Sequence, residues 1–436
     1  MRQRLTLKQL LQPLKEISES LPEHRRGHNK QYTLSDAALS AFSVFYMQSP
    51  SFLEWQRRMQ RHKGKNNATS LFGVQRIPST EQIRNLLDPV SEEHFGEAYW
   101  ALFDMVKERE ELEAFRQSMG TWLVSLDGTQ HHSSTSIHCE QCRRIERKGQ
   151  THYDHQVLLA VLCAPHEKVV LPLQPEFITP QDGAEKQDCE QAAIKRWIQK
   201  YHQRFSPWEV TLLADDLHSR QPVCSVALEH KMHFIFTCKE SSHRSLYEEL
   251  HLLEKVEGGV KEKEERHWNG RYWERRRYRW AEALPLRRGP DALLVNWCEV
   301  TVWRESTGKR TFHGAWVTDH AVDEHNVMAI TSAGRGRWKV ENEGNNVLKN
   351  QGYQFEHNYG HGKQHLANVL LTLLLLAFLM HAIFDLIDEK YQAIREELGA
   401  RRTFFETIRS LTRFQYFRNW EHLLVFMFHG LELEPG

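Results

Sequence analysis

The spacing of apolar residues changes near residue 120, and this change most restricts how the chain can fold. Before it, apolar residues recur at helical spacing between polar or Ser-Pro breaks. After it come short apolar runs typical of buried strands, and two of them, residues 122–127 and 208–215, end in aspartate. The sequence therefore predicts a mixed α/β fold that begins with helices. Those helices are predicted at residues 35–48, 51–62, 79–87 and 92–117.

Beyond residue 120, predicted strands and helices alternate. A hairpin is expected around Pro165, and helices are expected at residues 189–201 and 219–229. Residues 240–320 are charged, aromatic and β-rich, and the helix-forming stretch after them carries Glu341. The predicted strands are residues 122–127, 157–163, 168–173, 208–214, 233–238, 271–280, 292–303 and 310–318.

Charge and cysteine usage narrow the class of protein. Lys+Arg and Asp+Glu both number 57 in the 436 residues, so any attraction to a polyanion must be local. The seven cysteines are an odd number spread along a long chain, which predicts reduced thiols and a cytoplasmic protein. The polar N-terminus has no signal-peptide core.

One stretch, residues 366–384, has a composition close to that of a membrane span. Asn368, Thr372 and His381 interrupt it. Its longest unbroken apolar run, residues 373–380, is much shorter than the ~18–20 residues that a span requires. We therefore expect a buried helix and no membrane partner.

Two aspartates have positions that suit metal-dependent chemistry. Asp127 follows Val-Ser-Leu and Asp215 follows Leu-Leu-Ala, each where a predicted strand ends. Carboxylates at the ends of adjacent strands converge in an α/β sheet. A two-metal phosphodiester site needs such oxygen ligands for Mg²⁺ or Mn²⁺, completed by a third carboxylate from a helix. The alternative is that each aspartate only forms a turn, as in Asp127-Gly128.

The third carboxylate is expected at Glu341. Arg337 and Glu341 are i,i+4 neighbours on one helix face, which favours an ion pair between them. Glu343 lies roughly 200° round an α-helix from Glu341, so the two glutamates cannot reach one metal. We expect Glu343 to be a solvated or structural charge. Lys349 lies about 80° from the line of Glu341.

These residues resemble the DDE transposases of bacterial insertion sequences, in particular the group with a β-strand insertion in a ribonuclease-H-like catalytic domain. The third signature of that group is Tyr, two residues, Arg, three residues, Glu, six residues, Lys. Arg337 and Glu341 match this spacing, whereas Gly334 occupies the Tyr position and Leu348 the Lys position, with Lys349 one place late.

The first two acidic motifs of that group resemble Asp127-Gly-Thr and Ala-Asp215-Asp-Leu. The order of the second motif favours Asp215 over Asp216 as the metal ligand. The resemblance spans roughly residues 120–385 and implies a ribonuclease-H-like core with a β-rich insertion, preceded by a helical domain and followed by a helical tail. The expected divisions are residues 1–118 (helical N-terminal domain, DNA-end binding), 119–239 (first part of the core), 240–322 (β-rich insertion), 323–388 (second part of the core with the Glu-bearing helix) and 389–436 (helical C-terminal tail).

The function that the resemblance implies is DNA transposition. Such a protein binds the terminal inverted repeats of an insertion sequence, nicks double-stranded DNA and joins the 3′-hydroxyl ends to target DNA. Asp127, Asp215 and Glu341 would hold Mg²⁺ or Mn²⁺, and Arg337 would hold a phosphate or orient Glu341. A homodimer is expected in the synaptic complex, in a bacterial, nucleoid-associated cytoplasmic setting. No Gly-rich phosphate loop occurs, so no nucleotide partner is expected.

Two other functions remain open on the sequence alone. One is a domesticated derivative that binds DNA without transposing it. The other is a metal-dependent DNA nuclease without strand transfer. Joining of a pre-cut DNA end to a target separates a transposase from both.

Three features are candidate DNA contacts. Strand alternation puts Arg271, Arg275 and Arg277 on one face of an aromatic-rich segment, where they would grip phosphates or else form a solvated edge strand. Lys349 is a contact by resemblance alone. The short helix at residues 79–87, with Ser79 or Thr80 as its cap, belongs either to a helix-turn-helix DNA reader or to a helical packing domain.

A second metal is also considered. Cys139 and Cys142 have the spacing of a zinc knuckle, and His138, His152 and His155 lie near them. The sequence is compatible with a structural Zn²⁺ at Cys139 and Cys142. The alternative is a reduced cysteine pair near scattered histidines.

Overall fold

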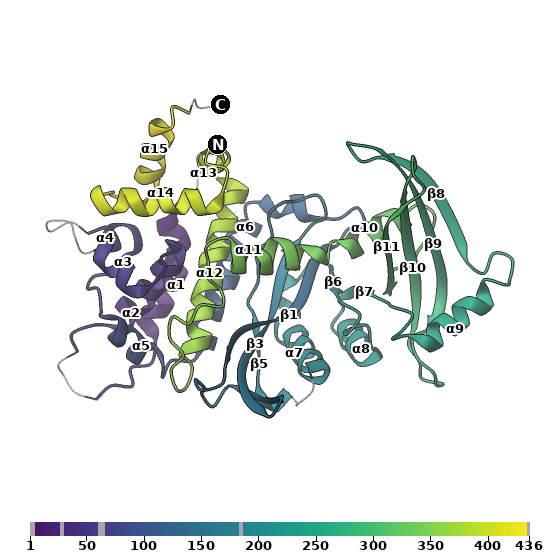
Figure 1. Ribbon diagram of the computed structural model, residues 1–436, viewed down its shortest axis with the longest axis horizontal. Coiled ribbons are helices and arrows are strands. Elements are labelled where there is room, and N and C mark those ends of the chain that lie inside the picture. The colour runs from purple at the N-terminus through teal and green to yellow at the C-terminus, as the bar shows by residue number, and fades with distance from the viewer. Residues whose placement is uncertain (1–4, 27–29, 60–65, 183–185, 434–436) are drawn as a thin grey trace.

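A computed structural model of the chain describes residues 5–26, 30–59, 66–182 and 186–433. Figure 1 shows a β-sheet that extends from the middle of the molecule to one end, while helices from both chain ends gather at the other end. Among the described residues, one mixed sheet contains eleven strands. The predicted mixed α/β fold is therefore confirmed.

The central part of the sheet is built on β1 (Trp122–Ser134). On one side of β1 lies antiparallel β3 (Gln150–Cys163), and on the other lies parallel β6 (Val210–Ala214), followed by parallel β7 (His233–Thr237). The far edge of β3 pairs with three short strands, namely β2 (Arg143–Arg147), β4 (Leu171–Pro172) and β5 (Glu176–Ile178). The hairpin predicted around Pro165 is confirmed by the pairing of β3 with β4.

The β-rich block after β7 continues the same sheet. β11 (Arg310–Thr318) pairs antiparallel with β7, and its other neighbours follow in the order β10, β9, β8. These are β10 (Leu294–Arg304), β9 (Trp273–Pro285) and β8 (Lys261–Trp268), with helix α9 (Arg244–Leu253) before them. One expectation is wrong here: Arg271 lies in the bend before β9, not on its face, because the chain turns there at Gly270 with φ 93°.

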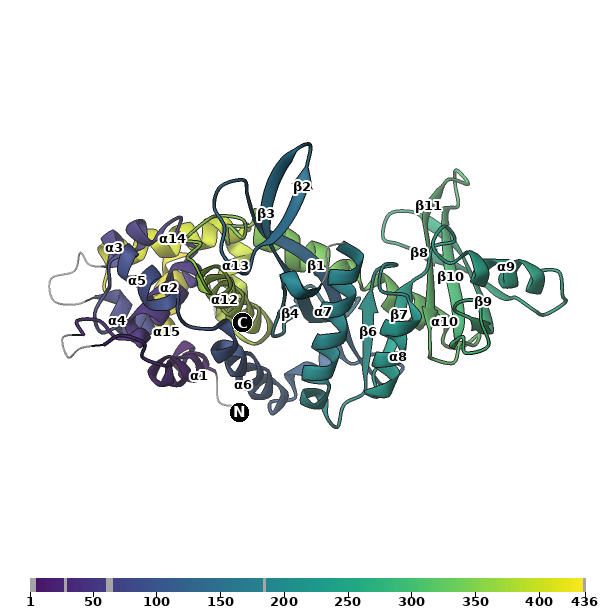
Figure 2. The ribbon, with the colours of Figure 1, turned by 90° about the horizontal axis from the view of Figure 1, so that it is seen from below.

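Different helices cover the two faces of the sheet. In Figure 2, α7 (Lys186–Tyr201) and α8 (Gln221–Glu229) lie in front of β1, β6 and β7. The opposite face carries α10 (Val327–Arg335), the π-helix η5 (Val340–Asn345) and α11 (Asn346–Asn350). There the Ser125 hydroxyl of β1 donates to the Arg337 carbonyl at 3.2 Å, which attaches this helical segment to the strand.

The helix-forming stretch around Glu341 is therefore not one regular α-helix. Gly334 and Gly336 lie at its first break, where glycine weakens helical structure. The Trp316 ring packs so closely on Gly334 that an added Cβ would lie 2.6 Å from its Nε1. The following turn widens to π geometry, a form that is frequent at functional sites.

Helices from both chain ends form a single body. Asn67 connects them: its side-chain amide donates to the carbonyls of Thr412 and Gln415, and its side-chain oxygen accepts from the Phe417 amide, each at 2.9 Å. The helices of this body are α1 (Leu7–Ser20), α2 (Leu34–Tyr46), α3 (Phe52–Met59), α4 (Asn67–Phe72), α5 (Thr80–Leu87), α6 (Gly96–Lys107), α12 (Leu366–Ile387), α13 (Glu389–Glu397), α14 (Arg401–Phe414) and α15 (Trp420–Gly430). Short 3₁₀ turns are η1 (Glu92–Phe95), η2 (Glu111–Phe115), η3 (Pro180–Asp182) and η4 (His202–Phe205).

Two N-terminal predictions need correction. The helix expected at residues 92–117 is interrupted, because Glu110 adopts a left-handed conformation with φ 59° between α6 and η2. Helix α4 lies between the predicted helices at residues 51–62 and 79–87, where the polar composition indicated only a break, and Asn66 caps it. In contrast, Ser79 caps α5 as predicted, through reciprocal hydrogen bonds with Gln82 at 3.1 and 3.2 Å.

Helix α12 is the apolar segment that resembles a membrane span. It is long and apolar enough to cross a membrane, but 83% of its most apolar window is buried inside the protein. The polar residues that interrupt it each make at least one hydrogen bond inside the protein. Asn368 donates to Glu92 at 2.8 Å, and His381 hydrogen-bonds the Tyr353 hydroxyl at 2.6 Å. The prediction of a buried helix is confirmed.

Candidate functional site

Asp127 and Asp215 lie at the same edge of the sheet. The parallel strands β1 and β6 pair from Trp122–Ser125 to Val210–Leu213, and each aspartate comes two residues after its paired segment. The carboxyl ends of neighbouring parallel strands are where α/β sheets build their sites. Asp127 is partly buried, whereas the Asp215 side chain is 43% exposed and also accepts from the Leu217 amide at 2.9 Å.

Glu341 reaches this edge from η5. Arg337 donates to the Glu341 carboxylate at 2.6 Å, the ion pair expected from their spacing. One turn further on, the Asn345 amide donates to the Asp127 carboxylate at 2.9 Å. Helix η5 packs on both β1 and β3. Hydrogen bonds thus attach η5 to β1 on the face where the acidic residues meet.

The charges at this edge act on one another. The pKa of Asp127 is raised from 3.8 to about 7, chiefly by burial and then by the negative charges of Glu341, Asp215 and Glu190, while Arg337 opposes the shift. The pKa is raised because the ionised form lacks both solvation and sufficient positive charge. A divalent cation at this edge would supply that charge and favour the ionised carboxylate.

The two neighbouring acids, Asp216 and Glu343, have other surroundings. The Asp216 carboxylate accepts from the Lys239 amide at 2.7 Å and from the Ser242 hydroxyl at 2.6 Å, so it fixes the turn after β7. Glu343 lines a cavity between η5 and β9. Both acids therefore have surroundings other than the group around Asp127. The choice of Asp215 and Glu341 as the metal ligands is kept.

Two residues of this edge were missed at the level of sequence: Glu190 and His218. Both are buried, and His218 Nε2 lies 4.0 Å from the Glu190 carboxylate and 3.8 Å from that of Asp215. An added Cβ on Gly128 would lie 2.7 Å from the Glu190 carboxyl carbon, so Gly128 permits this close approach. The sequence did contain a signal for Glu190: an acidic residue on the apolar face of α7, which also carries Ile194, is a charged group expected to be buried.

The predicted basic residues are dispersed. Arg275 and Arg277 share one face of β9 and stack over the Trp303 ring, at 4.9 and 5.3 Å from its centroid. Arg271 is exposed in the preceding bend. Lys349 forms an ion pair with Glu356 at 2.9 Å, at the far end of α11. Only Arg275 and Arg277, of these four, form a joint surface.

The predicted cysteine pair does come together, with one of the three histidines named from the sequence and one that was not. Cys139 and Cys142 group with His155 and also with His361, which lies before α12. His138 is exposed and stacks on Tyr153, with ring centroids 4.3 Å apart. The acids at the Asp127 edge are spread more widely: they do not form one of the groups, among the described residues, whose ligand atoms all lie within 4.8 Å of one another.

A wider spread of the carboxylates suits two ions better than one, since the metals of two-metal phosphodiester sites are about 3.5–4 Å apart.

Comparison with known proteins does not assign the chain to a family. No protein-family model matches the chain, and no curated protein matches it significantly. The functional inference therefore depends on the site itself.

Proposed function

We propose that the protein is a DDE-type DNA transposase that binds the ends of an insertion sequence, nicks DNA and joins the 3′-hydroxyl ends to a target. The observation that carries this proposal is the meeting of Asp127, Asp215 and Glu341 at one sheet edge, with the pKa of Asp127 raised to about 7. A site with this surplus of carboxylates favours hard divalent cations.

The order of the strands supports a ribonuclease-H-like core. The short strands β4 and β5 lie at one edge and are followed by β3, β1, β6 and β7. The pairs of β3 with β4, β5 and β1 are antiparallel, whereas β1, β6 and β7 are parallel. This is a three-stranded antiparallel meander continued by two parallel strands. The β8–β11 block is inserted after the last of these strands and before the Glu341 segment.

Asp127, Asp215 and Glu341 would hold Mg²⁺ or Mn²⁺. When bound, such ions activate water or a 3′-hydroxyl and stabilise the leaving oxygen of a phosphodiester. Arg337 keeps the Glu341 carboxylate in place through its 2.6 Å hydrogen bond. The Asn345 amide orients Asp127, and His218 Nε2 lies between the carboxylates of Asp215 and Glu190, at 3.8 and 4.0 Å.

Basic residues near the Glu341 segment would contact the DNA backbone. A cavity of about 580 Å³ separates β9 from η5 and is lined by Arg276, Arg335 and Lys339. On the other face of β9, Arg275 and Arg277 stack on Trp303, an arrangement that can hold phosphates and bases. We assign both faces of the insertion to DNA, and a homodimer to the complex that holds two DNA ends.

The test uses linear DNA that carries the element's own ends, with Mg²⁺ or Mn²⁺ added. Wild-type protein should nick this DNA, and Glu341→Gln should abolish nicking without loss of binding in a gel-shift assay. Glu343→Gln is the matched control and should still nick, because Glu343 lies outside the acidic group and removing its negative charge from the cavity assigned to DNA should not weaken binding. Full cleavage by Glu341→Gln would refute the assignment.

Strand joining separates the proposal from its alternatives. A pre-cut DNA end and a supercoiled target plasmid are incubated with the wild-type protein. A transposase joins them, whereas a metal-dependent nuclease only cuts, and a domesticated DNA-binding derivative does neither.

A further inference from the structure

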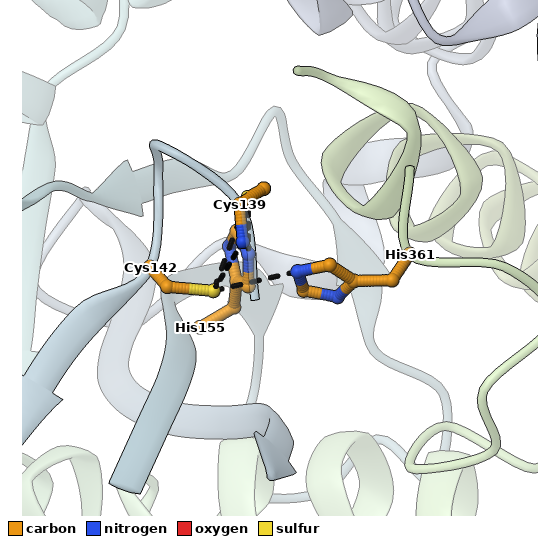
Figure 3. A group of neighbouring side chains, drawn as sticks. All are labelled: Cys139, Cys142, His155 and His361. Carbon is orange, nitrogen blue, oxygen red and sulfur yellow. Dashed lines mark hydrogen bonds between the residues drawn. The ribbon is translucent and has the colours of Figure 1, made fainter. Parts of the chain in front are cut away.

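Four potential metal ligands converge at a place separate from the acidic edge (Figure 3). Cys139 and Cys142 belong to the loop between β1 and β2, His155 belongs to β3, and His361 belongs to the segment between α11 and α12. Their ligand atoms all lie within 4.8 Å of one another, and Cys142, His155 and His361 are buried.

Three of the distances between these atoms match those of a tetrahedral shell. The two sulfurs are 3.9 Å apart, Cys139 Sγ is 3.2 Å from His155 Nε2, and Cys142 Sγ is 3.4 Å from His361 Nε2. Zinc–sulfur bonds of about 2.3 Å and zinc–nitrogen bonds of about 2.0–2.1 Å at tetrahedral angles require sulfur pairs about 3.8 Å apart and sulfur–nitrogen pairs about 3.5 Å apart. In these three pairs the ligand atoms already lie within a few tenths of an ångström of the spacing that one zinc ion requires.

The surrounding backbone supports the same geometry. Cys139 and Cys142 form a tight turn in which the Cys142 amide donates to the Cys139 carbonyl at 3.2 Å and the Cys139 amide donates to Cys142 Sγ at 3.4 Å. An amide donating to sulfur stabilises a thiolate, the form that binds metal. The sulfurs are too far apart for a disulfide, whose S–S bond is about 2.05 Å.

His361 lies in a loop whose backbone conformation is tightly restricted. It stands between Gly360 and Gly362, whose φ values of 157° and 72° favour glycine. An added Cβ on Gly362 would lie 2.1 Å from the Asp88 carboxylate. Asp88 accepts from the amide of Lys363 at 3.1 Å and from the two further amides that open α12.

We propose that Cys139, Cys142, His155 and His361 bind one structural Zn²⁺. Four protein ligands fill a tetrahedral shell and leave no position for water or substrate, which is the mark of a structural site. The ion would join the β1–β2 loop and β3 to a segment 219 residues beyond Cys142. It would thereby fix the chain between the Glu341 segment and α12, independently of the function proposed for the acidic edge.

The first experiment measures metal in the full-length protein. Protein purified without chelators should contain about one zinc per chain by mass spectrometry of the metal. After exchange with Co²⁺, it should show the absorption bands of tetrahedral cobalt with thiolate ligands. X-ray absorption of the zinc form should give two sulfur and two nitrogen neighbours.

Two histidine variants then test the ligand set. His361→Ala should lose the zinc and the cobalt bands, whereas His152→Ala should keep both, because His152 is absent from the group although its spacing from the cysteines fits a zinc motif. Cys142→Ser should lose the zinc. Its control is Cys163→Ser, which replaces a buried cysteine elsewhere in the sheet and should retain the metal.

Three results would overturn the proposal. One is wild-type protein that folds with no bound zinc and develops no thiolate–cobalt bands. Another is loss of the metal from His152→Ala with retention in His361→Ala. The third is an X-ray absorption spectrum without sulfur neighbours, which needs only the wild-type protein and so decides the matter even if the variants do not fold.

Discussion

Asp127→Asn should make the protein more stable in the absence of divalent metal, although it removes a proposed catalytic group. The pKa of Asp127 is raised from 3.8 to about 7, mainly by burial and then by Glu341. An acid whose folded pKa exceeds its unfolded pKa binds more protons in the folded state between those two values. Stability therefore falls as pH rises from about 4 to about 7, and the full loss is present above pH 7.

The size of the effect follows from the shift. At 1.36 kcal/mol for each pKa unit, the ionised Asp127 costs up to about 4 kcal/mol at pH 8. The substituted asparagine side chain is neutral, so it avoids this cost and keeps an oxygen that can accept from Asn345. For a chain of 436 residues the unfolding entropy is about 0.9 kcal/mol per kelvin, so the expected rise in Tm is about 4–5 °C at pH 8. At pH 5.5 the expected rise is about half as large.

The assay is thermal unfolding of wild type and Asp127→Asn, followed by circular dichroism from pH 5.5 to 8.5 without added divalent ions. Adding Mg²⁺ or Mn²⁺ at pH 8 should then raise the Tm of the wild type and leave that of the variant nearly unchanged. The control is Asp216→Asn, which weakens the turn held by Asp216 and should lower Tm at every pH.

Two outcomes would refute this reasoning. If Asp127→Asn is less stable than wild type at pH 8, the carboxylate is not under electrostatic strain. If the difference in Tm is the same at every pH, the effect does not come from ionisation of Asp127.

Three other substitutions test further parts of the structure. Gly128→Ala would force the Glu190 carboxyl group away, and we expect nicking to fall about 100-fold with an unchanged circular dichroism spectrum; normal nicking would remove Glu190 from the site. Asn67→Ala loses three hydrogen bonds between the chain ends and should lower the free energy of unfolding by about 3 kcal/mol in a denaturant titration, whereas a loss below about 1 kcal/mol would contradict its bridging role. Arg275→Ala combined with Arg277→Ala should weaken DNA binding and reduce the slope of log K against log salt by about two; an unchanged slope would exclude this face from the DNA interface.

The elements of the fold that depend on local pattern were predictable from the sequence. The strand before Asp215, the apolar α12 and the capping of α5 each follow from a periodicity or a cap within a few residues. The ion pair between Arg337 and Glu341 was also predictable, because helix spacing alone brings them together.

Features that depend on contacts distant in sequence were not predictable. His361 joins Cys142 across 219 residues, and no spacing rule selects it over His152. The π-helix around Glu341 was also not predicted, because the spacing of residues in this segment fits a regular α-helix. Likewise, no local pattern indicates that β11 pairs with β7 and extends the central sheet.

The union of the two chain ends also has a consequence for the order of folding during synthesis. Asn67 finds its partners Thr412 and Gln415 about 345 residues later. At about 5–20 residues per second, a ribosome needs roughly 20–70 s to make that length. In the folded protein α12 packs on α2, and α14 packs on α3. Until α12 and α14 are synthesised, the apolar surfaces of α2 and α3 that they cover remain exposed. The sheet, encoded between them, can pair its strands before α2 and α3 are covered, so the two ends of the chain complete their packing last.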